Sequence, residues 1–374
     1  MKRVVLTDDQ TLDTVLECLV EHLPLEMQGA CDPETLFSIV LRAASTNDSI
    51  EHTCQTLTDV PCGNDIRYHL EAYQDVPTVE AALNQVFRAR LPGGLRRRAH
   101  RLACDVNLLP YYGVPTEGEA AYIYRSQAEA GTCSFYAYAT CYVICQGKRV
   151  TIALTAVRQD DTMVAILTRL LTRVRLLDVQ VKRLYLDRGF FSVPVLRWLL
   201  ALDVPFEMPV VVRGKHGGTR QLAQGRASYA TWYTMVSQTY GSVSFQVVVV
   251  CGYRHGQRGQ HGREYFLYAV HRVVLRGRAL FHDYRRRFGI ESSYRLKNTC
   301  RIKTTTKNPA VRLLFVGVAF LLIDLWVYLL WTVVSQPRQG GRRIYRKEFP
   351  LKTFLEFLRQ AIDAHHQVRR EVMM

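Results

Sequence analysis

The chain has 374 residues, of which 48% are hydrophobic and 10% aromatic, and 49 Lys and Arg against 33 Asp and Glu give it a net charge of +16. This length leaves room for two or three domains, and the composition excludes a disordered or fibrous protein. The positive balance indicates a polyanionic partner without identifying it. Ten cysteines without a Cys-x-x-Cys pair, and an N-terminal apolar run too short for a signal peptide, predict a cytoplasmic protein with reduced thiols.

The charge is divided unevenly along the chain. Residues 1–90 hold six Lys and Arg and fifteen Asp and Glu, a balance of −9, whereas residues 91–374 carry a balance of +25. The change coincides with the turn signal Pro92-Gly93-Gly94 and the basic run Arg96-Arg97-Arg98. We therefore expect a domain boundary near residue 92 and the anion-binding surface in the C-terminal part.

Residues 1–92 are predicted to form a helical domain. Apolar residues recur at helical spacing between 12 and 20, and Asp32-Pro33 predicts a helix start with Asp as the cap and Pro at the first position. Residues 45–57 have the pattern of a helix-turn-helix unit, although the acidity of this region argues against a main DNA-binding surface. Binding of DNA ends and dimerisation both remain open as roles for this domain.

The pattern changes to strands and helices after residue 93. The predicted strands are 101–106, 135–145, 150–157, 181–186 and 206–212, and the predicted helices are about 161–174 and 193–202. This order predicts an α/β fold in which a mixed sheet is flanked by helices. We assign residues 93–212 and 279–335 to the two parts of this core.

Residues 213–278 interrupt the alternation of strands and helices. Two basic, glycine-rich stretches, 213–220 and 254–263, bracket strand-like segments, which predicts a β-rich insertion with basic loops. Trp232 lies in this insertion. Stacking on an unpaired base and packing inside the insertion both remain open for its ring.

The C-terminal part contains an apolar run, 313–334, that nearly reaches the length of a membrane span. Asp324 interrupts this run and basic residues flank both of its ends, so we expect a buried central helix, with a membrane span as the alternative. Residues 336–374 are predicted to form a basic tail with one amphipathic helix from about residue 342.

Two acids, Asp105 and Asp187, end predicted apolar strands. Open α/β sheets place their sites at the edge where the carboxyl ends of neighbouring strands meet, although each acid alone is also explained as a cap or a turn residue. Tyr284, Arg287 and Glu291 stand at i, i+3 and i+7, which puts them on one helix face. An intrahelical ion pair would explain Arg287 and Glu291, but it explains neither Tyr284 nor the two strand-end acids.

Four segments together carry a resemblance to a known family. They are Cys104-Asp105 with Pro110-Tyr111-Tyr112-Gly113, Leu184-Tyr185-Leu186-Asp187-Arg188-Gly189-Phe190-Phe191, the Tyr284 to Glu291 stretch, and Arg301-Ile302-Lys303-Thr304-Thr305-Thr306. Over about residues 95–335 the chain resembles the DDE transposases of bacterial and archaeal insertion sequences. The subgroup it resembles has a β-strand insertion and a Tyr-x2-Arg-x3-Glu-x6-Lys signature.

The resemblance implies an RNase H-like fold, with the β-rich insertion between the second Asp and the Glu. It implies that Asp105, Asp187 and Glu291 are the catalytic acids and hold two Mg²⁺ ions, for which Mn²⁺ substitutes. The implied activity is cleavage and transfer of DNA strands by a homodimer bound to double-stranded transposon ends and target DNA, in a prokaryotic cytoplasm at the nucleoid and without a membrane. The residues expected to contact DNA are Tyr284, Arg287, Arg188, Trp232, Arg295 and Lys297.

The sequence departs from the signature at one position. The Lys expected six residues after Glu291 is Asn298, so Arg295 and Lys297 are both candidates for the missing phosphate contact. Two other activities remain open: an RNase H-like nuclease that cuts without joining, and a non-catalytic DNA-binding derivative of a transposase.

Overall fold

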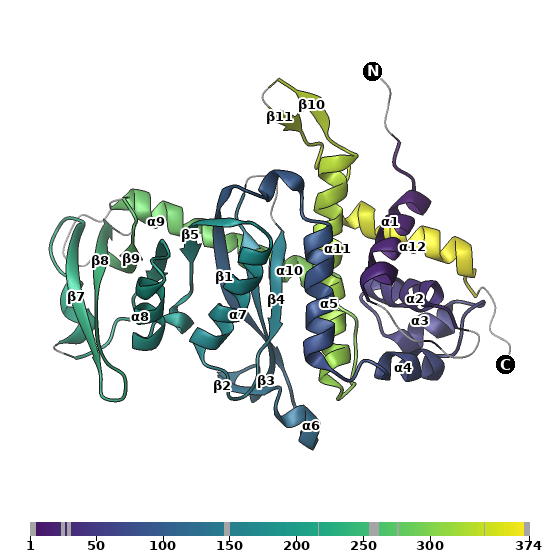
Figure 1. The fold of residues 1–374 in the computed structure, drawn as a ribbon, viewed down its shortest axis with the longest axis horizontal. Coiled ribbons are helices and arrows are strands. Elements are labelled where there is room, and N and C mark those ends of the chain that lie inside the picture. Colours follow the sequence, from purple (N-terminus) through teal and green to yellow (C-terminus); the bar gives the residue numbers. More distant parts are fainter. Residues whose placement is uncertain are drawn as a thin grey trace.

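The computed structural model describes residues 5–23, 27, 31–145, 150–215, 217–253, 262–274, 277–339 and 341–369. The helices are α1 (Asp8–His22), α2 (Pro33–Thr46), α3 (Ile50–Thr56), α4 (Gly63–Glu71), α5 (Val76–Ala89), α6 (Glu117–Ala120), α7 (Met163–Leu176), α8 (Val193–Ala201), α9 (Arg278–Tyr284), α10 (Phe288–Thr299), α11 (Pro309–Thr332) and α12 (Leu351–His366). The strands are β1 (Ala99–Pro110), β2 (Ile123–Glu129), β3 (Thr132–Val143), β4 (Thr151–Ala156), β5 (Gln180–Tyr185), β6 (Phe206–Pro209), β7 (Tyr229–Ser237), β8 (Gly241–Tyr253), β9 (Arg263–His271), β10 (Gln336–Arg338) and β11 (Gly341–Arg343). The molecule is elongated, with helices at one end and the β7–β9 strands at the other (Figure 1).

A mixed sheet forms the centre and one end of the molecule. In the described part of the chain its strand order is β2-β3-β1-β5-β6-β9-β8-β7, and β4 also pairs with β3. The β1–β5 and β5–β6 pairs are parallel, whereas the other described pairs of this sheet are antiparallel. The predicted α/β fold with a mixed sheet flanked by helices is therefore confirmed. The β-rich insertion extends this same sheet, because β9 pairs with β6.

Helices cover both faces of the sheet. On one face, Tyr185 of β5 and Val248 of β8 pack with Leu280 of α9 and Ile290 of α10. On the other face, α7 and α8 lie on the strands, and Phe245 of β8 meets the ring of Phe191 just before α8. Side chains alternate between the faces of a strand, so the odd-numbered and even-numbered residues of β8 pack against the helices on opposite faces of the sheet.

The central helix α11 is buried, as its sequence predicts. Asn308 caps its first turn by accepting two backbone hydrogen bonds, and Pro309 occupies the first helical position. The helix is long and apolar enough to cross a membrane, with a mean hydropathy of 2.5 over its most apolar 18 residues, but 89% of this stretch is buried inside the protein. Asp324 within it accepts a hydrogen bond from the backbone N–H of Thr151 at 3.0 Å, which satisfies the acid in the core.

The helical end combines the N-terminal segment with the C-terminal tail. Helix α12 packs against α1 and α2, and α5 packs against α11 and β4 (Figure 1). Gly317 of α11 lies so close to Leu83 of α5 that a Cβ at this glycine would collide with the leucine methyl groups. Helices α2 and α3 form a helix-turn-helix arrangement in which Asn47, at φ 55°, makes the left-handed turn. A DNA-reading role for this pair stays a prediction.

Three local predictions are wrong. Strand β1 does not end after Asp105 but continues to Pro110, because β3 provides hydrogen-bond partners along that length. The helix with the signature residues is broken, since α9 ends at Tyr284 and a 3₁₀ turn, Arg285–Arg287, precedes α10. The tail is not one helix from residue 342, because the β10–β11 hairpin comes first and Pro350 starts α12. The second basic stretch, 254–263, lies outside the described residues except for its last two positions.

Candidate active site

Asp105 and Asp187 occupy equivalent positions beside the β1–β5 pair. The last paired residues of these parallel strands are Ala103 and Tyr185. Each acid follows its paired residue by two positions, so both acids belong to the same face of the sheet. Since β5 ends here while β1 continues along β3, Asp105 lies within a strand and Asp187 lies at a strand exit. The sequence therefore correctly predicts that the two acids follow neighbouring strands, although it misplaces the end of β1.

Helix α10 brings Glu291 to the same edge. The guanidinium of Arg287 donates to Glu291 Oε1 at 2.8 Å and to Asp105 Oδ2 at 3.4 Å. The Arg287 side chain is 11% exposed, compared with 15% for Asp105 and 42% for Glu291. Arg287 therefore joins a strand acid to a helix acid at a site that is open to solvent on the Glu291 side.

The charges of Arg287, Asp187 and Glu291 all act on Asp105. Burial raises the pKa of Asp105 to about 7; Arg287 opposes this shift, and Asp187 and Glu291 add to it. Burial alone would lower the pKa of the Arg287 guanidinium. Its pKa is nevertheless raised, by Tyr284 and by the same three carboxylates. Three acids around one guanidinium leave an excess of negative charge that a cation would neutralise.

The acids do not form a ready-made metal site. Arg287 stands between Asp105 and Glu291, and Asp187 accepts a hydrogen bond from the backbone N–H of Gly189 in its own turn. Within the described ranges, no three His, Cys, Asp or Glu side chains lie close enough together to hold a metal ion. The donor chemistry still fits a hard divalent cation, because carboxylate oxygens are the ligands that Mg²⁺ prefers.

Tyr284 is turned inward instead of facing solvent. Its hydroxyl donates to the backbone carbonyl of Leu186 at 3.0 Å, and its ring centroid lies 5.6 Å from the Arg287 guanidinium carbon. Burial raises the pKa of this hydroxyl. Tyr284 therefore ties the segment just before Asp187 to the helical segment that carries Glu291, and its contact with phosphate stays a prediction.

The two candidates for the missing signature Lys lie in different surroundings. Lys297 is 2% exposed, and its ammonium donates to Asn107 Oδ1 of β1 at 2.8 Å. Burial lowers the pKa of Lys297 to about 8, and the charge of Arg301 adds to this shift. Arg295 is exposed on α10, with Ser292 Oγ at 3.4 Å. Of the two side chains, only Arg295 is placed to reach a phosphate at the surface.

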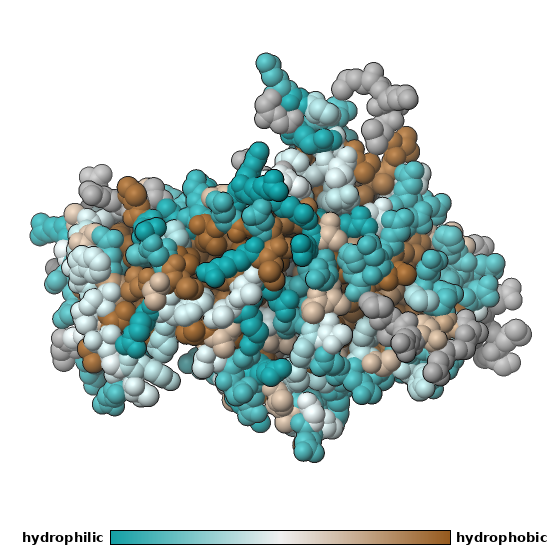
Figure 2. All heavy atoms as spheres, in the orientation of Figure 1, coloured by the Kyte–Doolittle hydropathy of each residue, from teal (hydrophilic) through white to brown (hydrophobic). Residues whose placement is uncertain are grey.

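Two further residues expected to bind DNA are exposed. Trp232 is 72% exposed on the outer face of β7, so packing inside the insertion does not explain it. Arg188 follows Asp187 and, with Arg285, borders a hollow of about 370 Å³ whose walls are mainly aromatic and apolar. In the view of Figure 2, hydrophilic side chains lie among apolar surface in the part of the molecule that carries α8 and α9.

The sequence did not reveal a polar contact behind Asp105. The Tyr294 hydroxyl shares a 2.8 Å hydrogen bond with Thr140 Oγ1, and Thr140 is the cross-strand partner of Asp105. Burial raises the pKa of Tyr294 and the charge of Asp105 adds to this shift. The spacing of Tyr294, three residues after Glu291, was the available signal for this contact.

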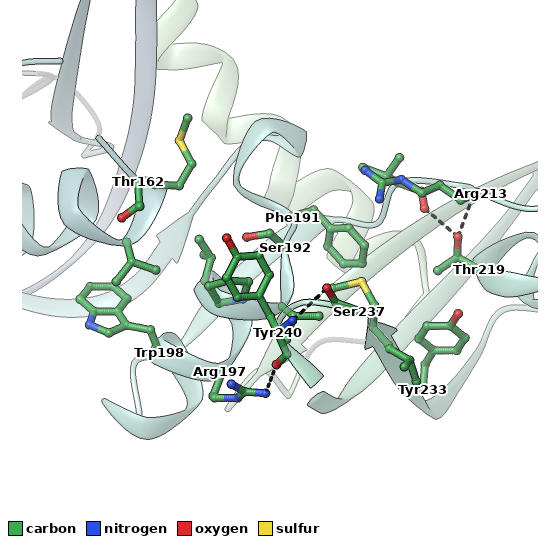
Figure 3. Close-up of a pocket in the computed structure, with 18 of the residues that line it drawn as sticks. Thr162, Phe191, Ser192, Arg197, Trp198, Arg213, Thr219, Tyr233, Ser237 and Tyr240 are labelled. Atoms are coloured by element: carbon green, nitrogen blue, oxygen red, sulfur yellow. Dashed lines mark hydrogen bonds between the residues drawn. The ribbon is translucent and has the colours of Figure 1, made fainter. Parts of the chain in front are cut away.

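A larger hollow, of about 1180 Å³, lies between α8 and β7 (Figure 3). Trp198, Tyr233 and Tyr240 contribute aromatic surface to it. The guanidinium of Arg197 donates to the carbonyls of Tyr240 and Ser242, at 2.7 and 3.1 Å, and so holds the β7–β8 turn. The lining of this hollow does not include the three acids.

The sequence matches no model of a known protein family, and it matches no curated protein. The fold, in contrast, is similar to that of a transposase. One similar structure is a cryo-EM structure of the piggyBac transposase in a synaptic complex with hairpin DNA, with a TM-score of 0.59 and 11% sequence identity over 97% of this chain and 81% of that chain. At this level of identity the similarity is one of fold.

Proposed function

We propose that this protein is a DDE transposase with an RNase H-like core that cleaves DNA strands and transfers them. One observation carries the proposal: Asp105 and Glu291, which are far apart in the sequence, share the guanidinium of Arg287, and Asp187 follows the β1–β5 register at the position that matches Asp105. The similarity to a transposase bound to DNA supports the same function. The placement of β7–β9 between the second acid and Glu291 agrees with the subgroup that the sequence resembles.

In this proposal Asp105, Asp187 and Glu291 hold two Mg²⁺ ions, or Mn²⁺ in their place. Bound there, the ions would activate the attacking hydroxyl and stabilise the leaving oxygen of a phosphodiester. Binding of these two ions requires two changes in the protein itself. Asp105, whose pKa is raised to about 7, gives up its proton, and the guanidinium of Arg287 moves away from at least one carboxylate.

The proposed substrate is double-stranded DNA, at the ends of a mobile element and at its target, bound by a homodimer that holds two ends. The balance of +25 over residues 91–374 and the exposed Arg188 and Arg295 support phosphate binding. We place this activity at the nucleoid of a prokaryotic cell, where the ten free cysteines stay reduced.

A non-catalytic DNA-binding role is the second candidate. It is favoured by one feature of the site, the Arg287 guanidinium that stands between Asp105 and Glu291. In that case the Arg287 guanidinium stays permanently between Asp105 and Glu291 in place of a metal ion. The protein then binds DNA, and added Mg²⁺ does not lead to cleavage.

The Glu291→Gln variant separates these two functions. For a transposase, Mg²⁺-dependent nicking of a plasmid that carries the DNA flanking the gene falls by about 100-fold or more, because a lost ligand removes several kcal/mol of transition-state stabilisation. DNA affinity, measured by fluorescence anisotropy, stays the same. Glu348→Gln, a change of an exposed acid, is the matched control. Nicking by the Glu291 variant at the rate of the control would refute the assignment of the acids, and a wild-type protein that binds but never nicks DNA would support the second candidate.

A further inference from the structure

A second group of charged side chains lies on β1, on β5 and on α9, the helix that precedes the one carrying Glu291. Asp283 of α9, 5% exposed, is its centre. Arg183 of β5 pairs with Asp283 Oδ2, and the Tyr185 hydroxyl donates to the same oxygen at 2.7 Å. Arg101 of β1 approaches Asp283 Oδ1 to 3.5 Å. We call Arg101, Arg183, Tyr185 and Asp283 the anchor cluster.

The anchor cluster repeats the spacing of the acids. Arg101 lies four residues before Asp105, and Arg183 lies four residues before Asp187. The two arginines are direct partners in the β1–β5 register. Four residues of strand span about 13 Å and return to the same face, so each strand carries an arginine and an acid in line.

The third element follows the same plan. Asp283, near the end of α9, lies eight residues before Glu291 in the helical segment that runs from α9 into α10. This segment therefore meets the two strands at two places, at the anchor cluster and at the acids. Two separated contacts fix both the direction and the register of a segment, whereas one contact leaves it free to pivot.

The apolar contacts of the segment are less specific. Leu280, Tyr284 and Ile290 pack on the sheet, but apolar packing is largely non-directional. A carboxylate that receives two guanidinium groups and one hydroxyl has a narrow range of permitted positions. Only Tyr284 and the 3₁₀ turn Arg285–Arg287 separate Asp283 from α10, so the position of Asp283 restrains where α10 begins.

We propose that Asp283 is a positioning residue, which through Arg101 and Arg183 sets the register of the Glu291 helix against the strands of Asp105 and Asp187. This inference rests on the proposed function, since it concerns the placement of the three proposed catalytic acids. Asp283 itself does not touch the reacting atoms. Its loss changes the alignment of the acids and leaves the DNA-binding surface in place.

The test compares Asp283→Asn with wild type in Mg²⁺-dependent nicking. The asparagine keeps the shape of the side chain but not its charge. We expect kcat to fall by about tenfold or more, because misplacement of a catalytic group by about 1 Å is enough for such a loss. DNA affinity stays constant, and the Mg²⁺ concentration for half-maximal rate rises. Asp283→Glu, which retains the charge, recovers part of the rate.

Asp203→Asn is the matched control. Asp203 also pairs with two basic side chains, His271 and Arg272, but it lies in the turn between α8 and β6 and is half-exposed. This variant keeps the wild-type kcat and Mg²⁺ dependence. Should Asp283→Asn fail to fold, Tyr185→Phe removes only one hydrogen bond to Asp283 and shows the same pattern to a smaller extent. A loss of DNA affinity in parallel with kcat would overturn the inference, because it would indicate general destabilisation.

Hydrogen exchange separates this inference from the proposed function. Without metal or DNA, the backbone amide protons of α9 and α10 exchange with solvent faster in Asp283→Asn than in wild type, while the exchange rates in α7 are unchanged. If wild-type protein does not cut DNA at all, the proposed function fails and exchange alone decides whether Asp283 fixes the segment. Unchanged exchange over α9 and α10 would overturn the anchoring role in either case.

Discussion

The acid site and the anchor cluster lie on the same face of the same two strands, yet their charges are arranged in opposite ways. At the acid site, three carboxylates surround one guanidinium, and Glu291 is 42% exposed. At the anchor cluster, one carboxylate that is 5% exposed receives two arginines, and Arg286 approaches it from the rim at 3.4 Å. One site is left negative and open, and the other is closed and supplied with cations by the chain.

This difference shows which buried carboxylates receive enough hydrogen-bond donors and positive charge from the protein itself. A buried carboxylate is stable only if donors are provided, and the anchor cluster provides them from three elements. The acid site provides one guanidinium for three acids, and in the proposed function the remaining negative charge is balanced by metal ions. A buried charge pair that is fully matched holds structure together, whereas one that is incompletely matched is available for binding and catalysis.

Among the variants that test this difference, removal of the guanidinium at the acid site has the largest expected effect on stability. Arg287→Met leaves Asp105 and Glu291 without their cation, so the free energy of unfolding falls by about 1–3 kcal/mol, at the low end for a buried pair because Glu291 is half-exposed. Millimolar Mg²⁺ then restores more stability to the variant than it adds to wild type. Chemical denaturation with and without Mg²⁺ measures both changes.

Arg295→Met, a change of an exposed residue on the same helix, is the control for Arg287→Met. Its unfolding free energy and its response to Mg²⁺ match those of wild type. An equal response to Mg²⁺ in both variants would mean that Arg287 is not the cation that balances the acids.

The next effect concerns Glu207, which lies beside the anchor cluster. Arg183 approaches one of its oxygens to 3.6 Å, but neither oxygen receives a hydrogen bond from any described residue. Burial raises the pKa of Glu207 from 4.5 to about 8; Arg183 opposes this shift, Asp283 adds to it, and Arg101 opposes it. Glu207 is therefore the part of this region that the arginines do not satisfy.

Glu207 makes stability depend on pH. Between its unfolded pKa near 4.5 and its folded pKa of about 8, the folded protein keeps a proton that the unfolded chain loses. The free energy of unfolding therefore falls as pH rises through this window, by at most about 1.4 kcal/mol per pH unit, and levels off above it. Glu207→Gln removes this contribution, so urea unfolding across the window shows a smaller fall than in wild type. Glu348→Gln keeps the wild-type pH profile, and an identical profile in the Glu207 variant would contradict its buried, protonated state.

The smallest expected effects are those of Arg295 and Lys297, the two candidates for the phosphate contact of the signature Lys. Arg295→Ala weakens DNA binding and lowers the slope of log affinity against log salt by about 0.9 if one phosphate contact is lost. Lys297→Met leaves this slope unchanged but lowers the free energy of unfolding by about 1 kcal/mol, because Asn107 loses its donor. A reduced salt slope in the Lys297 variant would show that this buried ammonium reaches DNA after a rearrangement.

Much of the fold could be predicted from local pattern. The cap at Asp32, the β3–β4 hairpin and the apolar run of α11 are each encoded within a few consecutive turns or strand residues. The end of β1 was missed because it depends on β3, thirty residues away in the chain. The break at Arg285–Arg287 was missed because a helical spacing of side chains is nearly the same on both sides of one 3₁₀ turn.

The sequence by itself identified the candidate residues of the site: two acids that follow strand-like segments, and a Tyr, an Arg and a Glu at helical spacing. Only the tertiary structure decided how their charges are shared. In the folded protein the Arg287 guanidinium donates to Asp105 and Glu291, the Tyr284 hydroxyl donates to the Leu186 carbonyl, and the buried Lys297 donates to Asn107. The physical reason is that periodicity reports the face on which a side chain lies, whereas burial and charge partners depend on which distant element covers that face.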